Sequence, residues 1–388
     1  MPVHHILVGT HSDQIHLVEF DSSSPSLTVL HSLKLRDQPS WIVLSPTHSG
    51  LCYVNGWVDD VCYAVRFDVV EGFEVLGEAR AGGGGPTHME VTPDGKALSS
   101  VNYRSGSLVY TPLLDDGLFA QPSPFPNQIH HFAFSRTEAT HPRQESAHPH
   151  HLVPLGDDWL VPDLGSDRIW QMRWVGEAQE GTWDVVREFE REQYDGPRHG
   201  VKSADGKHLY LVNELAATVS VLALPSSPTD GLSTLSSAPV LPPYLRDVAR
   251  SDPYDLIPCT ILLLSPLPST SADAPSTLLV SNRNAPLALA PDGDTIVSFS
   301  IPPNAPALLG EPTFLHGAGR HLRGMAAGPP DGDERERFVL VMGRDEGGMS
   351  VYERRVDGTL CRVLGNVLSE VEKPVAAVWL PSREGGEA

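Results

Sequence analysis

Hydrophobic and polar residues alternate along most of the chain in short runs. The clearest of these runs are Ile6–Gly9, Ile15–Phe20, Val61–Phe67, Leu209–Val212 and Thr218–Leu224. Because successive side chains of a strand point to opposite faces, this period of two predicts β-strands. Asp-Gly pairs, which favour tight turns, separate many of the runs, at residues 94–95, 205–206, 292–293 and 357–358. Few long segments show a helical period, so the chain is predicted to be nearly all β.

Two segments of the chain repeat each other without gaps. Residues 85–113 align with residues 196–224 and share ten of 29 positions, among them Gly-Pro, Asp-Gly-Lys and Val-Asn. The segments start about 110 residues apart, which is twice about 55, and one seventh of the 388-residue chain is also about 55. A repeat of this length built from short strands is typical of the blades of a β-propeller.

Seven positions open the predicted repeats, most of them with proline. They are Pro39, Pro86, Pro149, Pro197, Pro258, Leu322 and Pro374. The strand predicted over Pro374–Trp379 precedes a charged tail, so we expect it to complete the blade that contains Ile6–Phe20, which leaves no free sheet edge. The predicted fold is therefore all-β: one seven-bladed propeller domain over residues 1–388, with four antiparallel strands per blade. Loop insertions are predicted near residues 120–147, 225–256 and 265–276.

The net charge of the chain limits the classes of partner that it is expected to bind. Lys and Arg number 28 against 49 Asp and Glu, a formal net charge of −21, which argues against binding to nucleic acid or to an anionic membrane surface. The four cysteines form no CxxC pair, and no apolar run is long enough to span a bilayer, so a cytoplasmic protein with reduced thiols is expected. The sequence leaves the oligomeric state open. Arginine far outnumbers lysine, and arginine is the residue suited to a two-pronged grip on carboxylate or phosphate.

Positions at which the repeats disagree are candidates for function. The residue after each opening position is, in order, Ser40, Thr87, His150, Arg198, Cys259, Arg323 and Val375. The residue after the strand that follows is Gly56, Tyr103, Leu164, Glu214, Arg283 or Arg344. We expect both series to meet at one mouth of the central channel, where several guanidinium groups would repel each other unless they hold a small polyanion. The alternative is that these residues form ion pairs between blades, such as Glu214 with Arg198.

Other possible sites have less support. The histidines of residues 130–151 have no carboxylate or cysteine at a regular ligand spacing, so no metal site is predicted. The run Gly82–Gly85 lacks the order of a phosphate-binding P-loop. Ser45 and Ser203 lack the GxSxG context of a nucleophilic serine.

Several motifs resemble those of a known family, the seven-bladed propeller lactonases. The similarity is densest over residues 143–224, with Arg143-Gln144-Glu145 and His148-Pro149-His150, then Pro162-Asp163-Leu164-Gly165 and Gly196-Pro197-Arg198-His199. The segments 211–214 (LVNE) and 280–283 (VSNR) extend it, and the start at His4-His5 is similar to that of the fungal 3-carboxy-cis,cis-muconate lactonizing enzyme. The family also includes bacterial 6-phosphogluconolactonases.

The resemblance implies the roles of individual residues. The family's catalytic set of one His, one Glu and two Arg falls on His150, Glu214, Arg198 and Arg283. The residues expected to bind substrate are Arg323, Arg344, Tyr103, His88 and His199. No cofactor is expected. Arg283 is followed by Asn284-Ala285-Pro286 and a longer hairpin than usual, which affects the expected substrate size more than the chemistry.

Three functions are compatible with these residues. The first is hydrolysis of an anionic sugar lactone, with 6-phosphogluconolactone as the family's usual substrate. A water positioned by His150 or Glu214 would attack the lactone carbonyl, and Arg198 or Arg283 would stabilise the oxyanion. The second is a lactone-forming cyclase acting on carboxy-cis,cis-muconate, a tricarboxylate. The third is a propeller that only binds partners.

Overall fold

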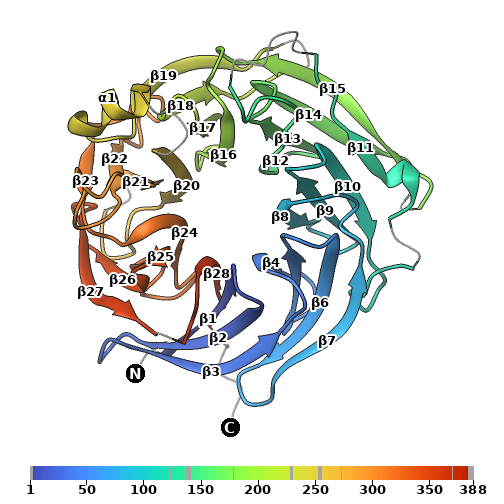
Figure 1. Cartoon of the computed structure of the whole chain (residues 1–388), viewed down its shortest axis with the longest axis horizontal. Coiled ribbons are helices and arrows are strands. Elements are labelled where there is room, and N and C mark those ends of the chain that lie inside the picture. The colour runs from blue at the N-terminus through green and yellow to red at the C-terminus, as the bar shows by residue number, and fades with distance from the viewer. Residues whose placement is uncertain are drawn as a thin grey trace.

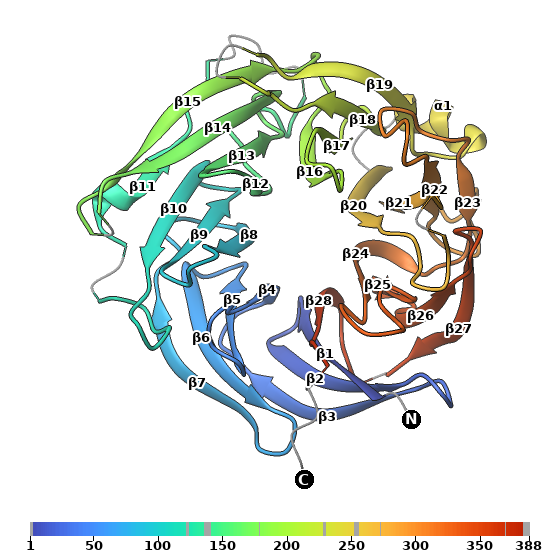
Figure 2. The ribbon, with the colours of Figure 1, turned by 180° about the vertical axis from the view of Figure 1, so that it is seen from behind.

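A computed structural model describes residues 3–121, 124–135, 141–177, 179–227, 230–251, 256–271, 273–368 and 370–382. Its strands form seven antiparallel sheets of four strands each, arranged as blades around a central axis (Figure 1). The view from behind shows the same closed ring (Figure 2). The predicted seven-bladed propeller is confirmed.

The four strands of each blade form four concentric rings. The inner strands are β28 (Pro374–Trp379), β4 (Pro39–Leu44), β8 (Pro86–Val91), β12 (Val153–Leu155), β16 (Pro197–Lys202), β20 (Ile257–Leu264) and β24 (Arg320–Gly328). The second strands are β1 (Val3–Thr10), β5 (Leu51–Gly56), β9 (Ala97–Asn102), β13 (Asp158–Asp163), β17 (His208–Asn213), β21 (Ser276–Arg283) and β25 (Phe338–Glu346).

The third strand of each blade is largely buried, whereas the outermost strand is mostly exposed or half-buried. The third strands are β2 (Gln14–Asp21), β6 (Val61–Asp68), β10 (Ser107–Pro112), β14 (Arg168–Val175), β18 (Thr218–Ala223), β22 (Ile296–Ile301) and β26 (Gly348–Arg354). The outer strands are β3 (Ser26–Lys34), β7 (Gly72–Ala79), β11 (Ile129–His131), β15 (Thr182–Glu190), β19 (Ser233–Pro239), β23 (Thr313–Leu315) and β27 (Leu360–Val367). A short 3₁₀ turn, η1 (Pro126–Gln128), precedes β11, and helix α1 (Pro243–Ser251) lies at the outer edge of the ring (Figure 1).

Burial follows the position of each strand in its blade. The second strands β5 and β13 are buried along their whole length, because each blade packs against a neighbour on both faces. The outer strand β15 instead alternates between exposed and buried residues. Separate apolar clusters fill the spaces between blades; one joins Val101 and Leu108 to Trp159 and Trp170 of the next blade.

The chain closes through its last strand. β28 pairs with β1, and the register joins Leu7 to Val378 and Val8 to Ala377. This pairing confirms the predicted completion of the first blade by the C-terminal strand. The pairing gives the first blade its inner strand and joins the two ends of the chain in one sheet, which closes the ring of blades.

Residues that are identical in the two repeats stabilise the fold. Gly95 and Gly206 have φ values of +71° and +68°, which favour glycine, in the turns between an inner and a second strand. The preceding carboxylates, Asp94 and Asp205, accept hydrogen bonds from the backbone N–H groups of residues 96 and 207 at 3.1 and 3.0 Å. The shared Asp-Gly-Lys sequence is therefore a turn that returns the chain across the blade.

Two of the predicted loop insertions contain regular structure. β11 lies within 120–147, and both β19 and α1 lie within 225–256, so parts of these segments complete their blades as outer strands. The sequence of β19, STLSSAP, is half-exposed and weakly apolar, which hid it from a search for alternation. Residues 122–123, 136–140, 228–229, 252–255 and 272 of the insertions lie outside the described residues. Across the described ranges, no helix has the length and apolar character needed to cross a membrane.

Candidate active site

The residues predicted for the site come together at one end of the blades. Arg198 lies at the start of the inner strand β16, and Glu214 follows the end of its partner β17. The two strands are antiparallel, with Pro197 opposite Asn213, so their side chains meet. Arg283 ends β21, and His150 follows Pro149, which bridges to Asp163 at the end of β13. The repeat comparison therefore identified a real spatial cluster.

Glu214 is the centre of this cluster. Its side chain is 1% exposed, and three guanidinium groups donate hydrogen bonds to it. Arg198 reaches Oε2, Arg143 reaches Oε1, and Arg283 reaches Oε1 at 3.1 Å. These arginines come from three consecutive blades or their connecting loops. The carboxylate thus ties together the blades that surround it.

The charge state of Glu214 follows from these contacts. Burial alone would raise its pKa, but the charges of Arg198, Arg143 and Arg283 outweigh burial and hold the pKa well below its ordinary value. Glu214 is therefore an anion at neutral pH and a weak base. The ion pair of Glu214 with Arg198 is present, but it lies within one blade rather than between blades, because β16 and β17 belong to the same sheet.

Arg198 has no free donor pair to offer a ligand. Its Nη1 is bound to Glu214, its Nε donates to the backbone oxygen of Cys259 at 3.1 Å, and its Nη2 lies 3.4 Å from the Cys259 sulfur. Burial raises the pKa of the Cys259 thiol, but Arg198, Arg283 and Arg323 outweigh burial and lower it overall. Arg198 is therefore held as a positioning group for Glu214, and Cys259 is a site neighbour that the sequence analysis had not selected.

Arg143 is a functional candidate that the sequence analysis also missed. It lies in the segment before β12, and two backbone contacts fix that segment. The carboxylate of Asp163 accepts the His148 N–H at 2.6 Å, and Gln144 donates to the Leu164 oxygen at 2.9 Å. A Cβ on Gly165 would lie 1.7 Å from the Ser146 oxygen, so only glycine allows this approach. Arg143 belongs to one of the motifs that resemble the lactonase family, Arg143-Gln144-Glu145. That motif is the signal in the sequence that could have identified Arg143 as a site residue.

Arg323 offers an unpaired positive charge at the same end of the ring. Its guanidinium lies over the Trp57 ring, 5.7 Å from the centroid, and no described residue accepts a hydrogen bond from it. Burial, together with repulsion from Arg283, lowers its pKa to about 9. Arg104 lies over the same ring but donates to the backbone oxygens of Trp57 and Val58 at 2.7 and 3.0 Å. Arg323 is therefore the group best prepared to receive an anion.

Four histidines cluster beside the arginines. The Nδ1 atom of His150 lies 3.2 Å from the Nε2 atom of His199, and the rings of His88 and His151 have centroids 3.9 Å apart. Burial is the largest cause that lowers the pKa of each; the charge of Arg198 adds to it for His150, His151 and His199. The pKa of His151 falls to about 3. All four imidazoles are thus neutral near pH 7, and His150 can accept a proton.

The other predicted substrate-binding residues have different surroundings. Tyr103 is half-buried and stacks on His148 with a centroid distance of 4.1 Å. His88 is buried against Trp41, and its Nδ1 accepts the Leu152 N–H at 3.3 Å. Arg344 donates two hydrogen bonds to Asp345, at 2.7 and 3.0 Å, so it already has a counter-charge. Tyr103 is the best placed of these three to meet a ligand.

Two further histidines at this end were not predicted. His11 follows β1, and His321 lies in β24, where its Nδ1 is 2.7 Å from the Asn284 side-chain oxygen. Burial and the charges of nearby arginines lower their pKa values to about 2 and about 3. His11 occupies the position in the first blade that Glu214 and Arg283 occupy in theirs, which is a signal that the comparison of repeats could have used. Within the described ranges, no group of three His, Cys, Asp or Glu is arranged to hold a metal ion.

The buried histidines predict how stability depends on pH. Unfolded histidine has a pKa of about 6.5, whereas His88, His150 and His199 are held well below it in the folded protein. Below pH 6.5 the unfolded chain therefore binds more protons, and the free energy of unfolding falls as the pH falls. Each histidine should contribute up to about 1.4 kcal/mol per pH unit, measured by urea unfolding between pH 7.5 and about 5.

A pair of variants isolates this effect. His199→Asn should reduce the pH slope by up to one proton equivalent, because it removes one of the groups that the fold keeps neutral. His131→Asn, in which the replaced side chain is exposed, should leave the slope unchanged. An unchanged slope in His199→Asn would show that His199 is not held neutral by the fold.

Comparisons with known proteins identify the family that shares this fold. The family model described as "Lactonase, 7-bladed beta-propeller" matches residues 5–379. A 6-phosphogluconolactonase of Formosa agariphila is 26% identical over 367 residues, covering 91% of this chain and 93% of that protein.

Solved structures share the fold. The periplasmic gluconolactonase of Pseudomonas aeruginosa aligns with a TM-score of 0.79 at 24% identity, covering 98% of this chain and 99% of that one. A putative 6-phosphogluconolactonase from Bacteroides fragilis aligns with a TM-score of 0.77 at 22% identity, covering 97% and 98%. Because the family model spans nearly the whole chain, this protein belongs to the seven-bladed β-propeller lactonase family.

Proposed function

We propose that the protein hydrolyses a sugar lactone that carries a phosphate group, with 6-phosphogluconolactone as the first candidate. The observation that carries the proposal is the charge balance of the site. The guanidinium groups of Arg143, Arg198 and Arg283 share the carboxylate of Glu214, and that of Arg323 lies near them with no ion pair to a described carboxylate. The excess positive charge favours an anionic ligand, and family membership supports lactone chemistry.

His150 is the proposed general base. It takes a proton from a water molecule whose oxygen attacks the lactone carbonyl carbon. The carbonyl oxygen becomes an oxyanion that Arg283 stabilises, since the Nε of this buried arginine has no partner among the described residues. As the intermediate collapses, the ring C–O bond breaks, and His150 returns the proton to the ring oxygen. Water and these side chains supply every atom and proton of the step.

Binding of an anionic substrate should also change the pKa of the proposed base, His150. The positive charge of Arg198 and Arg323 contributes to the lowered pKa of His150. A bound phosphate offsets part of this charge and so raises the pKa of His150 toward the range in which a general base is effective. We therefore expect phosphorylation of the substrate to raise kcat as well as to lower KM.

The test is a parallel assay of the purified protein with 6-phosphogluconolactone and 3-carboxy-cis,cis-muconate. The proposal expects lactone hydrolysis well above the spontaneous rate and no ring formation from the muconate. Turnover of the muconate alone would favour the cyclase. Turnover of neither substrate would contradict both enzymatic functions and favour a propeller that only binds.

Arg323→Gln should separate binding of the anion from chemistry. Loss of a charge-assisted contact should raise the KM for 6-phosphogluconolactone about 10–100-fold. Glucono-δ-lactone, which has no phosphate, should lose no more than about threefold in kcat/KM. Steady-state kinetics with both lactones measure the difference.

Arg104→Gln is the matched control for this variant. It removes the other guanidinium that lies over Trp57, one whose hydrogen bonds go to the backbone. Its KM for the phosphorylated lactone should change by less than about threefold. An equal loss with both lactones in Arg323→Gln would show that Arg323 does not recognise the phosphate.

A further inference from the structure

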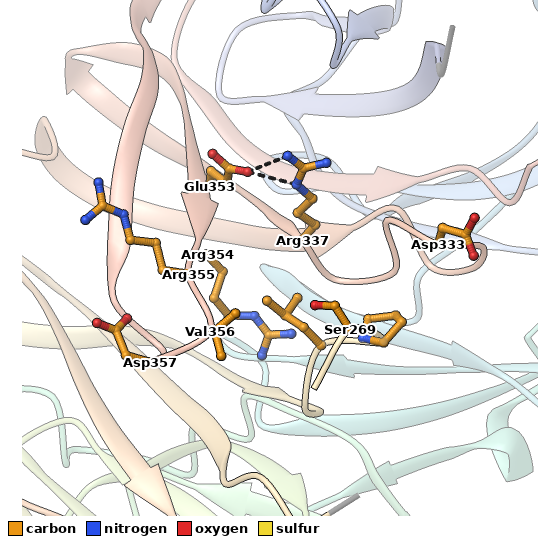
Figure 3. A pocket seen from close by; sticks show the side chains of 10 residues that line it. Ser269, Asp333, Arg337, Glu353, Arg354, Arg355, Val356 and Asp357 are labelled. Carbon is orange, nitrogen blue, oxygen red and sulfur yellow. Dashed lines mark hydrogen bonds and ion pairs between the residues drawn. The ribbon is translucent and has the colours of Figure 1, made fainter. Parts of the chain in front are cut away.

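A cavity lies at the opposite end of the blades from the candidate active site. Its volume is about 750 Å³, within the range of small-molecule sites. Leu267 and Ser269 line it from the loop between β20 and β21, and Arg354 and Val356 line it from the end of β26 and the turn that follows (Figure 3). That loop follows the end of β20, whereas Arg283 lies at the end of the antiparallel β21, so the two sites lie at opposite ends of this blade.

Arg354 is the unusual residue in this cavity. Its side chain is 3% exposed, and its Nε and Nη2 atoms have no hydrogen-bond partner among the described residues. In Figure 3 its guanidinium extends toward the loop that carries Ser269. Burial lowers its pKa, and the charge of Glu336 offsets only part of this effect. One carboxylate oxygen of Glu336 instead accepts the Ser265 N–H at 2.7 Å.

The neighbouring arginine shows the contrast. Arg337 lines the same cavity but is satisfied, because it donates to Glu353 at 2.6 and 2.8 Å (Figure 3). It also donates to Glu334 at 2.7 Å. A buried guanidinium with unused donors is costly unless an acceptor completes it. The empty donors of Arg354 therefore call for an oxyanion supplied from outside the chain.

We propose that this cavity binds a small organic molecule through its phosphate or carboxylate group, which Arg354 receives. Leu267 and Val356 contact the carbon part of the ligand, and the Ser269 hydroxyl lies in reach of its polar groups. The site is independent of lactone hydrolysis, since none of its residues belongs to the active-site cluster.

The test uses the methyl groups of Leu267 and Val356 as local reporters. Methyl-labelled full-length protein is titrated with sodium phosphate and, separately, with sodium acetate, against sodium chloride at matched ionic strength. The proposal expects both methyl signals to shift with phosphate or acetate, to saturate, and not to respond to chloride. Saturation by phosphate alone or by acetate alone identifies the group that the site prefers. Absence of a saturable shift with either anion in the wild-type protein overturns the proposal.

Two substitutions in the same turn sharpen the result. Arg354→Gln should weaken binding of the preferred anion at least about tenfold, because it removes the charge-assisted contact. Arg355 also borders the cavity, but it is exposed and its guanidinium points away from that of Arg354 (Figure 3), so Arg355→Gln should change the affinity by less than about threefold. Equal affinity in Arg354→Gln and the wild-type protein would overturn the proposal. Arg354→Lys, which keeps the charge, replaces the glutamine variant if that one fails to fold, and the wild-type titration stands without either.

An assay of lactone hydrolysis tests the proposed function separately from the proposed anion site. Arg354→Gln should hydrolyse 6-phosphogluconolactone at the wild-type rate. If the wild-type protein hydrolyses no lactone, the proposed function fails, while the methyl titration still decides whether the cavity beside Arg354 binds an anion.

Discussion

Glu214→Gln is expected to lower the free energy of unfolding by about 3–5 kcal/mol. The substitution keeps the shape of the side chain but removes the one negative charge that three buried or half-buried guanidinium groups share. Removing one partner of a buried ion pair leaves the other charges uncompensated, which costs more than the pair itself contributes. Urea unfolding followed by fluorescence or circular dichroism measures the change.

Glu74→Gln is the matched control. Glu74 pairs with Arg66 at 2.9 Å on the surface, where both side chains are about 60% exposed. Exposed pairs contribute about 0–1 kcal/mol, so this variant should be nearly as stable as the wild-type protein. Phosphate should restore part of the stability lost in Glu214→Gln, because an anion can replace the missing charge. A loss below about 1 kcal/mol in Glu214→Gln would show that Glu214 does not organise the arginines.

His150→Ala is expected to lower kcat for 6-phosphogluconolactone about 10²–10⁴-fold, the usual contribution of a general base. KM should change by only a few-fold, because the phosphate is held by Arg323 rather than by the imidazole. The removed side chain is neutral, so the free energy of unfolding should not fall as far as is expected for Glu214→Gln. Steady-state kinetics at pH 7 measure the effect.

His151→Ala provides the comparison for His150→Ala. His151 is the next residue, belongs to the same ring cluster and is also neutral near pH 7. Its removal should reduce kcat less than about tenfold. If both variants lose activity equally, the cluster acts as packing and His150 has no special part in proton transfer. If His150→Ala keeps kcat within about threefold, the base is another group.

Much of the fold could be predicted from the sequence, because a propeller repeats the same local problem seven times. Asp94-Gly95 and Asp205-Gly206 form the same turn, and Asn102 and Asn213 each donate side-chain hydrogen bonds at the end of a second strand. The same structural requirement in each blade therefore selects the same residues. The outer strands β11 and β19 escaped prediction because they are mostly exposed or half-buried. Backbone hydrogen bonds hold them in their blades, so their sequences need no alternation of apolar residues.

The site could be predicted where it occupies equivalent positions of the repeats. Arg198, Glu214 and Arg283 stand out because the equivalent positions of several other blades, such as Ser40 or Gly56, carry no charge. Arg143 lies outside the repeats, in a connecting segment, so no equivalent position reveals it. The roles of the arginines could be assigned only from the structure: the contacts show that Arg198 is fully engaged, whereas the Arg323 guanidinium donates no hydrogen bond to a described residue.

The overall charge of −21 conceals this local arrangement. Acidic residues spread over the surface keep the protein strongly negative, while the ring axis collects arginines from several blades. Because charges separated by more than about 8–10 Å are screened at physiological ionic strength, a small anion at the site responds to the nearby guanidinium groups more than to the distant carboxylates. An acidic protein can therefore hold an anionic substrate.

The most direct test of the account is a crystal structure of the protein with the hydrolysis product, 6-phosphogluconate. The account predicts that the phosphate lies within hydrogen-bonding distance of the Arg323 guanidinium and that the new carboxylate lies beside His150 and Arg283. A product bound elsewhere on the ring, or turned so that neither group meets these residues, would contradict it.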